Sequence, residues 1–206
     1  ALLVFVPALS ALWIVESSVS PWVVLAVSPL AFSLYALAER SDPRSSLAKL
    51  GWSSFGAVYL VLPTWSMFEI HSADPHLLLA LLVSVWANDT GALLVGSKFG
   101  RRKMAPCISP NKTWEGSIAG LIGGLVVGVA GLELATGSVT PAAAVLFGVV
   151  AVASQTGDLV ESSLKRAVGV KDAGSLLPGH GGMLDRLDAI LVASPVFYAL
   201  SVLIDL

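Results

Sequence analysis

Long apolar stretches alternate with short polar ones along the whole chain. A helix that crosses a bilayer needs roughly 20 predominantly apolar residues. The chain contains about seven stretches that approach this length, so the pattern predicts an all-α, polytopic bundle of transmembrane helices. The predicted spans are 1–15, 21–38, 51–68, 76–95, 116–132, 141–157 and 187–204.

Composition supports a membrane protein and leaves little sequence for a soluble domain. Hydrophobic residues make up 55% of the chain and charged residues 13%, against about 25% charged in soluble domains. We therefore expect one membrane domain over 1–206, in which 1–82 contributes hydrophobic spans and 83–206 the catalytic part. Because the chain starts at Ala1, without Met and within an apolar run, we expect further spans to precede it. Cys107 is the single cysteine, which excludes an intrachain disulfide.

The cations predict the orientation of these spans. All 12 Lys and Arg residues fall in the loops after the second, fourth and sixth predicted spans. The alternate loops, at 16–20, 69–76 and 133–140, contain none. Loops rich in Lys and Arg face the cytoplasm. The pattern therefore places the basic loops, and the polar stretch after the sixth span, on the cytoplasmic side.

The fifth predicted span carries a stripe of glycines spaced four residues apart, which places them on one helix face. Small residues on one face allow two membrane helices to approach closely. Helix packing is the simpler interpretation, and a smooth wall beside a lipid substrate is the alternative. The stripe consists of Gly116, Gly120, Gly124 and Gly128.

The stretch from 158 to 188 concentrates charge at the end of an apolar chain. Ionisable groups at a membrane edge are costly and by default mark a functional site. A salt-bridged cytoplasmic loop is the alternative. The stretch contains five carboxylates, four cations and one histidine: Asp158, Glu161, Asp172, Asp185, Asp188, Lys165, Arg166, Lys171, Arg186 and His180.

Spacing predicts how this stretch is arranged. If the sixth helix continues past Asp158, then Glu161, Ser162 and Lys165 share its face. Asp185 and Asp188 share a face at the start of the last span in the same way. Two carboxylate-bearing helix ends can converge, and oxygen ligands suit a hard cation such as Mg²⁺, which binds through one or two carboxylates and substrate phosphates. The neighbouring cations suit a polyphosphate, and the glycines near His180, including Gly181 and Gly182, allow close approach of a ligand.

Two further segments carry candidate site residues. Asn88 and Asp89 lie within the fourth span near its cytoplasmic end, where either a site or a packed, hydrogen-bonding residue is possible. The segment 109–116 contains polar residues directly before a helix, where free backbone N–H groups can bind an anion. An ordinary basic loop is the alternative there. Its candidate residues are Ser109, Asn111, Lys112 and Thr113.

At these residues the chain resembles the CDP-diacylglycerol synthases, also called phosphatidate cytidylyltransferases. The family pattern S-x-x-K-R-x4-K-D-x-G-x3-P-G-H-G-G-x-x-D-R-x-D is matched from Ser162 to Asp188. The upstream Gly157-Asp158-Leu159, the segment 109–116 and the Asp-Thr of the fourth span match as well. Asn111 stands where relatives often have Lys. The resemblance covers roughly Trp86 to the C-terminus.

The resemblance implies transfer of a cytidylyl group from CTP to phosphatidate, giving CDP-diacylglycerol and pyrophosphate, with Mg²⁺ as cofactor. It places metal binding on Asp158 and Asp185, with Asp188 in support. Lys165, Arg166 and the other cations of the stretch would hold the triphosphate. The role of a monovalent cation and homodimerisation stay open, and no nucleic-acid partner is expected. We also expect the protein to reside in the plasma (inner) membrane of a bacterium, and the charge pattern places its active site on the cytoplasmic side.

Two rival functions fit parts of the pattern. A CTP-dependent lipid kinase, such as a polyprenol kinase, would transfer the γ-phosphate, but the full motif argues against it. A transporter would place polar residues near the bilayer midplane and often contains internal repeats. Here the polar residues gather at one predicted edge, and the halves show no repeat.

Overall fold

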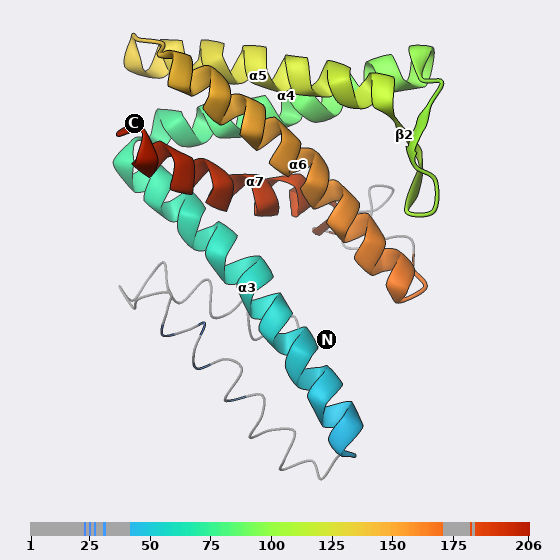
Figure 1. Ribbon diagram of the computed structural model, residues 1–206. Coiled ribbons are helices and arrows are strands. Elements are labelled where there is room, and N and C mark those ends of the chain that lie inside the picture. The colour runs from blue at the N-terminus through green and yellow to red at the C-terminus, as the bar shows by residue number, and fades with distance from the viewer. Residues whose placement is uncertain are drawn as a thin grey trace. The chain divides into compact units, whose positions relative to one another are not determined.

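The computed structural model describes residues 42–170, 182 and 184–206, together with Val23, Leu25, Val27 and Ala31 (Figure 1). The chain divides into two compact units, 1–69 and 70–206. The helices are α3 (Pro43–Ala73), α4 (Pro75–Phe99), α5 (Trp114–Thr136), α6 (Pro141–Ala167) and α7 (Leu184–Leu203). The strands are β1 (Lys103–Ala105) and β2 (Ser109–Thr113).

Helices α4, α5, α6 and α7 confirm the last four predicted spans. In the described part of the chain, these four helices are long and apolar enough to cross a membrane. Helix α3 contains the predicted span 51–68 but is not among them. The first predicted span, and the second apart from four scattered helical residues, lie outside the described residues. A total of seven spans therefore stays a prediction.

Local sequence explains where these helices begin and end. Asp74 accepts a hydrogen bond from the backbone N–H of His76 at the start of α4, and proline occupies the first turn. Proline suits this position because the first N–H groups of a helix have no intrahelical partner. Thr140 caps α6 in the same manner. Gly137 ends α5 with a φ of 71°, a left-handed conformation that glycine adopts without strain.

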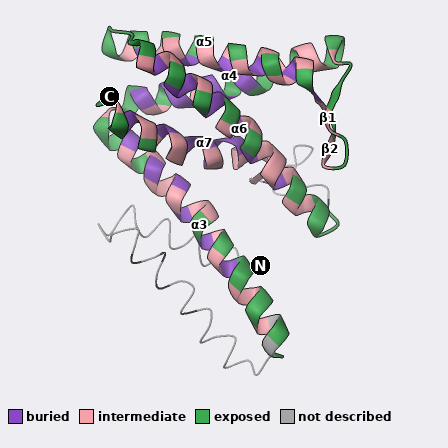
Figure 2. Cartoon of the chain, viewed as in Figure 1, coloured by how far each residue is buried: buried purple, intermediate pink, exposed green. Residues whose placement is uncertain are grey.

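Three glycines of the α5 stripe, Gly116, Gly120 and Gly124, pack against α4 and Gly128 packs against α6, which confirms the packing interpretation. A Cβ atom on Gly120 would lie 2.5 Å from the carbonyl oxygen of Asn88, and one on Gly116 would lie 2.6 Å from that of Ala92. The buried residues of α5 are the four stripe glycines and Leu132. Figure 2 shows the rest of α5 as largely exposed or half-buried. The missing side chains thus bring two backbones together along a single face.

Helix α6 packs against both α5 and α7 in the second unit. Phe147 and Phe197 are fully buried, with ring centroids 5.7 Å apart. Gly128 of α5 leaves the space that Phe147 fills. Near the other end of α6, a Cβ atom on Gly157 would lie 2.5 Å from the carbonyl oxygen of Asp188. The two helices therefore approach closely beside the charged stretch.

A short antiparallel hairpin of β1 and β2 connects α4 to α5 within the predicted all-α membrane fold. Glu115 fixes the base of the hairpin, because its carboxylate accepts hydrogen bonds from the backbone N–H groups of Arg101 and Arg102. The N–H of Trp114 donates to the carbonyl of Arg102 across the same base. These contacts hold the hairpin beside the start of α5.

Candidate active site

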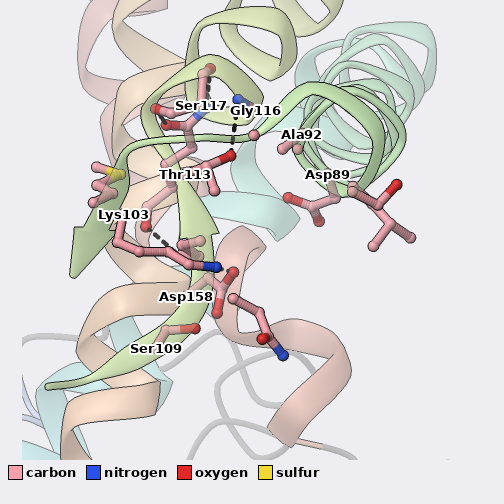
Figure 3. Close-up of a pocket in the computed structure, with 16 residues that line it drawn as sticks. Asp89, Ala92, Lys103, Ser109, Thr113, Gly116, Ser117 and Asp158 are labelled. Carbon is pink, nitrogen blue, oxygen red and sulfur yellow. Dashed lines mark hydrogen bonds and ion pairs between the residues drawn. The ribbon is translucent and has the colours of Figure 1, made fainter. Parts of the chain in front are cut away.

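A pocket of about 590 Å³ opens between α4, the hairpin, the start of α5 and α6 (Figure 3). Asp89 of α4 and Asp158 of α6 both contribute to its lining (Figure 3). Gly96, Gly100 and Gly116 also line it, at the close approach of α4 to the start of α5. The polar lining residues from the hairpin and α5 are Lys103, Ser109, Asn111, Lys112, Thr113 and Ser117.

Lys112 and Asp158 form an ion pair in this pocket, with 2.7 Å between Nζ and Oδ2. The same Nζ lies 3.5 Å from the carbonyl oxygen of Gln155, and Ser162 donates a 3.4 Å hydrogen bond to Asp158. The pair joins the hairpin to α6 across 46 residues of sequence. The structure therefore places the 109–116 segment, which contains candidate site residues, next to the charged stretch.

A second charged centre lies between α6 and α7. Lys165 Nζ lies 2.5 Å from Glu161 and 2.6 Å from Asp185, and Asp185 also accepts a 2.7 Å hydrogen bond from the N–H of Gly182. Glu161 is only 1% exposed. Helix α6 thus continues past Asp158, and Lys165 pairs with one carboxylate from each helix. In this arrangement Lys165 binds protein carboxylates and holds α6 against α7.

Two further carboxylates, one from α4 and one from α7, lie near the ion pair of Lys112 and Asp158. Asp89 of α4 and Asp188 of α7 each experience the negative charge of Asp158, and Asp188 also experiences that of Asp89. Lys112 offsets part of this repulsion at Asp89. Among the described residues, no three acidic, histidine or cysteine side chains are close enough to enclose a metal ion by themselves. The donors present would suit a cation that keeps water and phosphate ligands.

Asn88 is a predicted substrate contact, but its side chain forms hydrogen bonds within the protein instead. Its side chain is 0% exposed, and its Nδ2 donates to Ser154 Oγ at 3.0 Å and to the carbonyl of Ala151 at 3.2 Å. Gln155 donates to Asn88 Oδ1 at 2.8 Å. All its polar atoms are thus used between α4 and α6, which corresponds to the packed alternative. Asp89, one residue later, lines the pocket.

Gln155 belongs to the site although the sequence analysis did not select it. It lines the pocket, accepts a short hydrogen bond from Ser117 Oγ, and donates to the Ser117 carbonyl at 2.8 Å. Its side chain therefore connects α6 to both α5 and α4. The sequence contains a signal for Gln155, because a side-chain amide inside the apolar span 141–157 needs hydrogen-bond partners in lipid.

The remaining predicted residues divide between the two centres and the undescribed segment. Thr113 accepts a hydrogen bond from the N–H of Gly116 and so caps α5, which confirms the predicted helix start. Arg166 Nε donates to the carbonyl of Ile108 at 3.4 Å and joins the end of α6 to the hairpin turn. Arg186 lies in the first turn of α7. The predicted residues outside the described part of the chain are Lys171, Asp172, His180 and Gly181.

Comparison with known proteins identifies the family. The model of the Cytidylyltransferase family matches residues 1–204. The chain belongs to the cytidylyltransferase family. The phosphatidate cytidylyltransferase of Staphylococcus aureus (strain COL) is 37% identical over 183 residues, which cover 85% of this chain and 70% of that protein.

Two other bacteria contain relatives of the same name. The phosphatidate cytidylyltransferase of Haemophilus influenzae is 43% identical over 138 residues, covering 63% of this chain and 48% of that protein. That of Pseudomonas aeruginosa is 41% identical over 155 residues, covering 72% and 57%. Membership of the cytidylyltransferase family and four apolar helices together establish an integral membrane nucleotidyltransferase.

Proposed function

We propose that the protein is a phosphatidate cytidylyltransferase, which converts CTP and phosphatidate into CDP-diacylglycerol and pyrophosphate. The observation that carries the proposal is the pocket beside Asp158. There, carboxylates and a lysine from α4, the hairpin, α6 and α7 meet at one end of four apolar helices. A site at a helix end can receive a nucleotide from water and a lipid headgroup from the leaflet.

The reaction depends mainly on reducing the repulsion between two anionic reactants and on aligning them. An oxygen of the phosphatidate phosphate would attack the α-phosphorus of CTP, and the bond to the β-phosphate oxygen would break to release pyrophosphate. The attacking oxygen is already anionic, so the step needs no general base. Both reactants are negatively charged, and catalysis of such transfers is mostly positioning and electrostatic stabilisation.

Lys112 is the described cation best placed to offset this charge, because its Nζ lines the pocket and is held by Asp158 and the Gln155 carbonyl. Its contact with Asp158 prevents the long side chain from turning away to solvent. Lys165 would instead act through Asp185 and Glu161, whose positions it fixes. Thus one lysine faces the reactants while the other supports the carboxylates.

We further propose Mg²⁺ as the cofactor. Asp158 would hold it with Asp185 or Asp188, all oxygen donors at the meeting of α6 and α7, and water and phosphate oxygens would complete its shell. When bound, the ion would reduce the repulsion between the two phosphate groups. Because Asp158 and Asp185 each bind a lysine in this structure, metal binding would rearrange those ion pairs.

Isotope position tests the reaction directly. With purified protein, phosphatidate and Mg²⁺, label at the α-phosphate of CTP should enter the lipid fraction together with an equal amount of pyrophosphate. Label at the γ-phosphate should stay out of the lipid. Entry of γ-label would establish the lipid-kinase alternative, and unchanged CTP with every lipid phosphate supplied would refute nucleotidyl transfer.

A further inference from the structure

A buried hydrogen-bond network lies directly behind the pocket and joins its three helices. Gln155 of α6 is the centre of this network, since its side-chain amide contacts Ser117 of α5 and Asn88 of α4. Asn88 then continues the network to Ser154 and the Ala151 carbonyl, further back on α6. One glutamine thus sets the distance and register between α6 and both neighbouring helices.

The network is close in sequence to three charged groups of the pocket, Asp89, Lys112 and Asp158. Asp89 directly follows Asn88, Asp158 lies one helical turn after Gln155, and Lys112 lies just before the start of α5. Asp158 stands on α6, whereas Lys112 comes with α5 and the hairpin, so their 2.7 Å contact depends on how α5 sits against α6. The Gln155 side chain fixes that relation through two hydrogen bonds to Ser117.

We infer that Gln155 is a positioning residue, whose side chain holds Lys112 against Asp158 in the geometry that the reaction requires. The expected change in kcat rests on the proposed function. The expected change in the position of Lys112 does not. The main-chain carbonyl of Gln155 adds to the effect, because it lies 3.5 Å from Lys112 Nζ. Small displacements at a reacting centre are expensive: a misplacement of about 1 Å can lower the rate roughly 100-fold.

The variant Gln155→Met tests this role, because methionine keeps the length of the side chain and removes its hydrogen bonds. The matched control is Ser84→Ala, which removes the buried 2.8 Å hydrogen bond from Ser84 to the Gly124 carbonyl between α4 and α5, away from the pocket. Ser117→Ala is a milder second variant, since it removes one hydrogen bond of the network and keeps the glutamine.

Two measurements on the detergent-solubilised full chain give separate answers. The first is the acylation rate of Lys112 by an amine reagent, followed by mass spectrometry with exposed Lys98 as the internal reference. We expect Gln155→Met to raise the relative rate at Lys112 severalfold and Ser117→Ala to raise it less. The second is transfer of α-label from CTP, for which we expect kcat to fall about 10- to 100-fold in Gln155→Met with a smaller change in KM. Ser84→Ala should change neither measurement.

The outcomes separate the inference from the proposed function. Labelling of Lys112 that stays at the wild-type rate in both Gln155→Met and Ser117→Ala overturns the positioning role, whatever happens to kcat. Equal effects of Gln155→Met and Ser84→Ala also overturn it, because general loosening of the helices would then suffice. If labelling rises as expected but the wild-type protein transfers no α-label, Gln155 positions Lys112 and the proposed function is what fails.

Discussion

Charged side chains from α4, the hairpin, α6 and α7 make up the site, and Asp158 of α6 contacts or acts on several of them. It binds Lys112, and its negative charge acts on Asp89 and Asp188. Replacing it by asparagine keeps its size and removes the charge that holds the lysine and would attract a cation. Loss of charge at this residue should therefore affect chemistry far more than folding.

We expect Asp158→Asn to lower the rate of α-label transfer by at least about 100-fold, because a bound cation supplies several kcal/mol of charge stabilisation. Asp74→Asn is the matched control at the opposite end of α4. The hydrogen bond from the His76 backbone lowers the pKa of Asp74, so this carboxylate is also ionised at neutral pH. Asparagine caps a helix nearly as well as aspartate. Near-normal turnover of Asp158→Asn would remove Asp158 from the metal site.

The second charged centre predicts a stability effect. Lys165→Met would leave Glu161, which is 1% exposed, with a charge that no cation neutralises in the described structure. Removing one partner of a buried pair typically costs about 3–5 kcal/mol. We expect a clear fall in the denaturation midpoint, and the double variant Lys165→Met with Glu161→Gln should recover part of it. A single variant as stable as wild type would show that Glu161 is not charged in the folded protein.

At the scale of elements, the glycine stripe of α5 determines how closely α4 and α5 approach. Gly120→Ala would place a methyl group 2.5 Å from the Asn88 carbonyl oxygen and 2.7 Å from its Oδ1, at the network behind the pocket. We expect destabilisation of about 1–3 kcal/mol, the usual cost of overpacking. Gly148→Ala is the control, because its methyl group would meet only a side-chain atom, Leu125 Cδ1, at 3.4 Å. Thermal unfolding in detergent that ranks Gly148→Ala as the more damaging change would contradict this account.

The helices could be predicted from the sequence, whereas the hairpin could not. Apolar runs long enough to span a bilayer identify α4 to α7 without reference to tertiary contacts. The hairpin has strands of three and five residues and contains Pro110, so it lacks the alternating pattern of a strand. Its conformation depends instead on Glu115, which reaches back to the backbone of Arg101 and Arg102.

The sequence indicates which charged residues belong to the candidate site, but it does not indicate which residues they contact. Density of charge at a membrane edge selected Asp158, Lys165 and Asp185, and helical spacing placed the first two on one face. Spacing cannot show which cation meets which carboxylate, because Lys112 and Asp158 belong to different elements. The position of Asn88 deep in a predicted span marks it as unusual. Only the fold shows that its side-chain amide forms hydrogen bonds between α4 and α6.

For the whole molecule, the arrangement of helix ends supports the charge-based orientation. The end of α4, the hairpin, the start of α5, the end of α6 and the start of α7 meet, as the contacts of Lys112, Arg166 and Lys165 show. The cations of two predicted cytoplasmic loops therefore lie at the same end of the second unit. The loop between α5 and α6 lies at the other end and contains no Lys or Arg.

Native Cys107, exposed in the hairpin, provides the test of this orientation. In intact cells an impermeant thiol reagent should leave Cys107 unmodified, and permeabilisation should make it reactive, because the hairpin is expected in the cytoplasm. In a Cys107→Ser background, Ser138→Cys in the exposed α5–α6 loop should react without permeabilisation. Modification of Cys107 from outside, with protection of Ser138→Cys, would invert the topology. It would also place the pocket beside Asp158 on the side where CTP is absent, and the proposed reaction could then not occur in the cell.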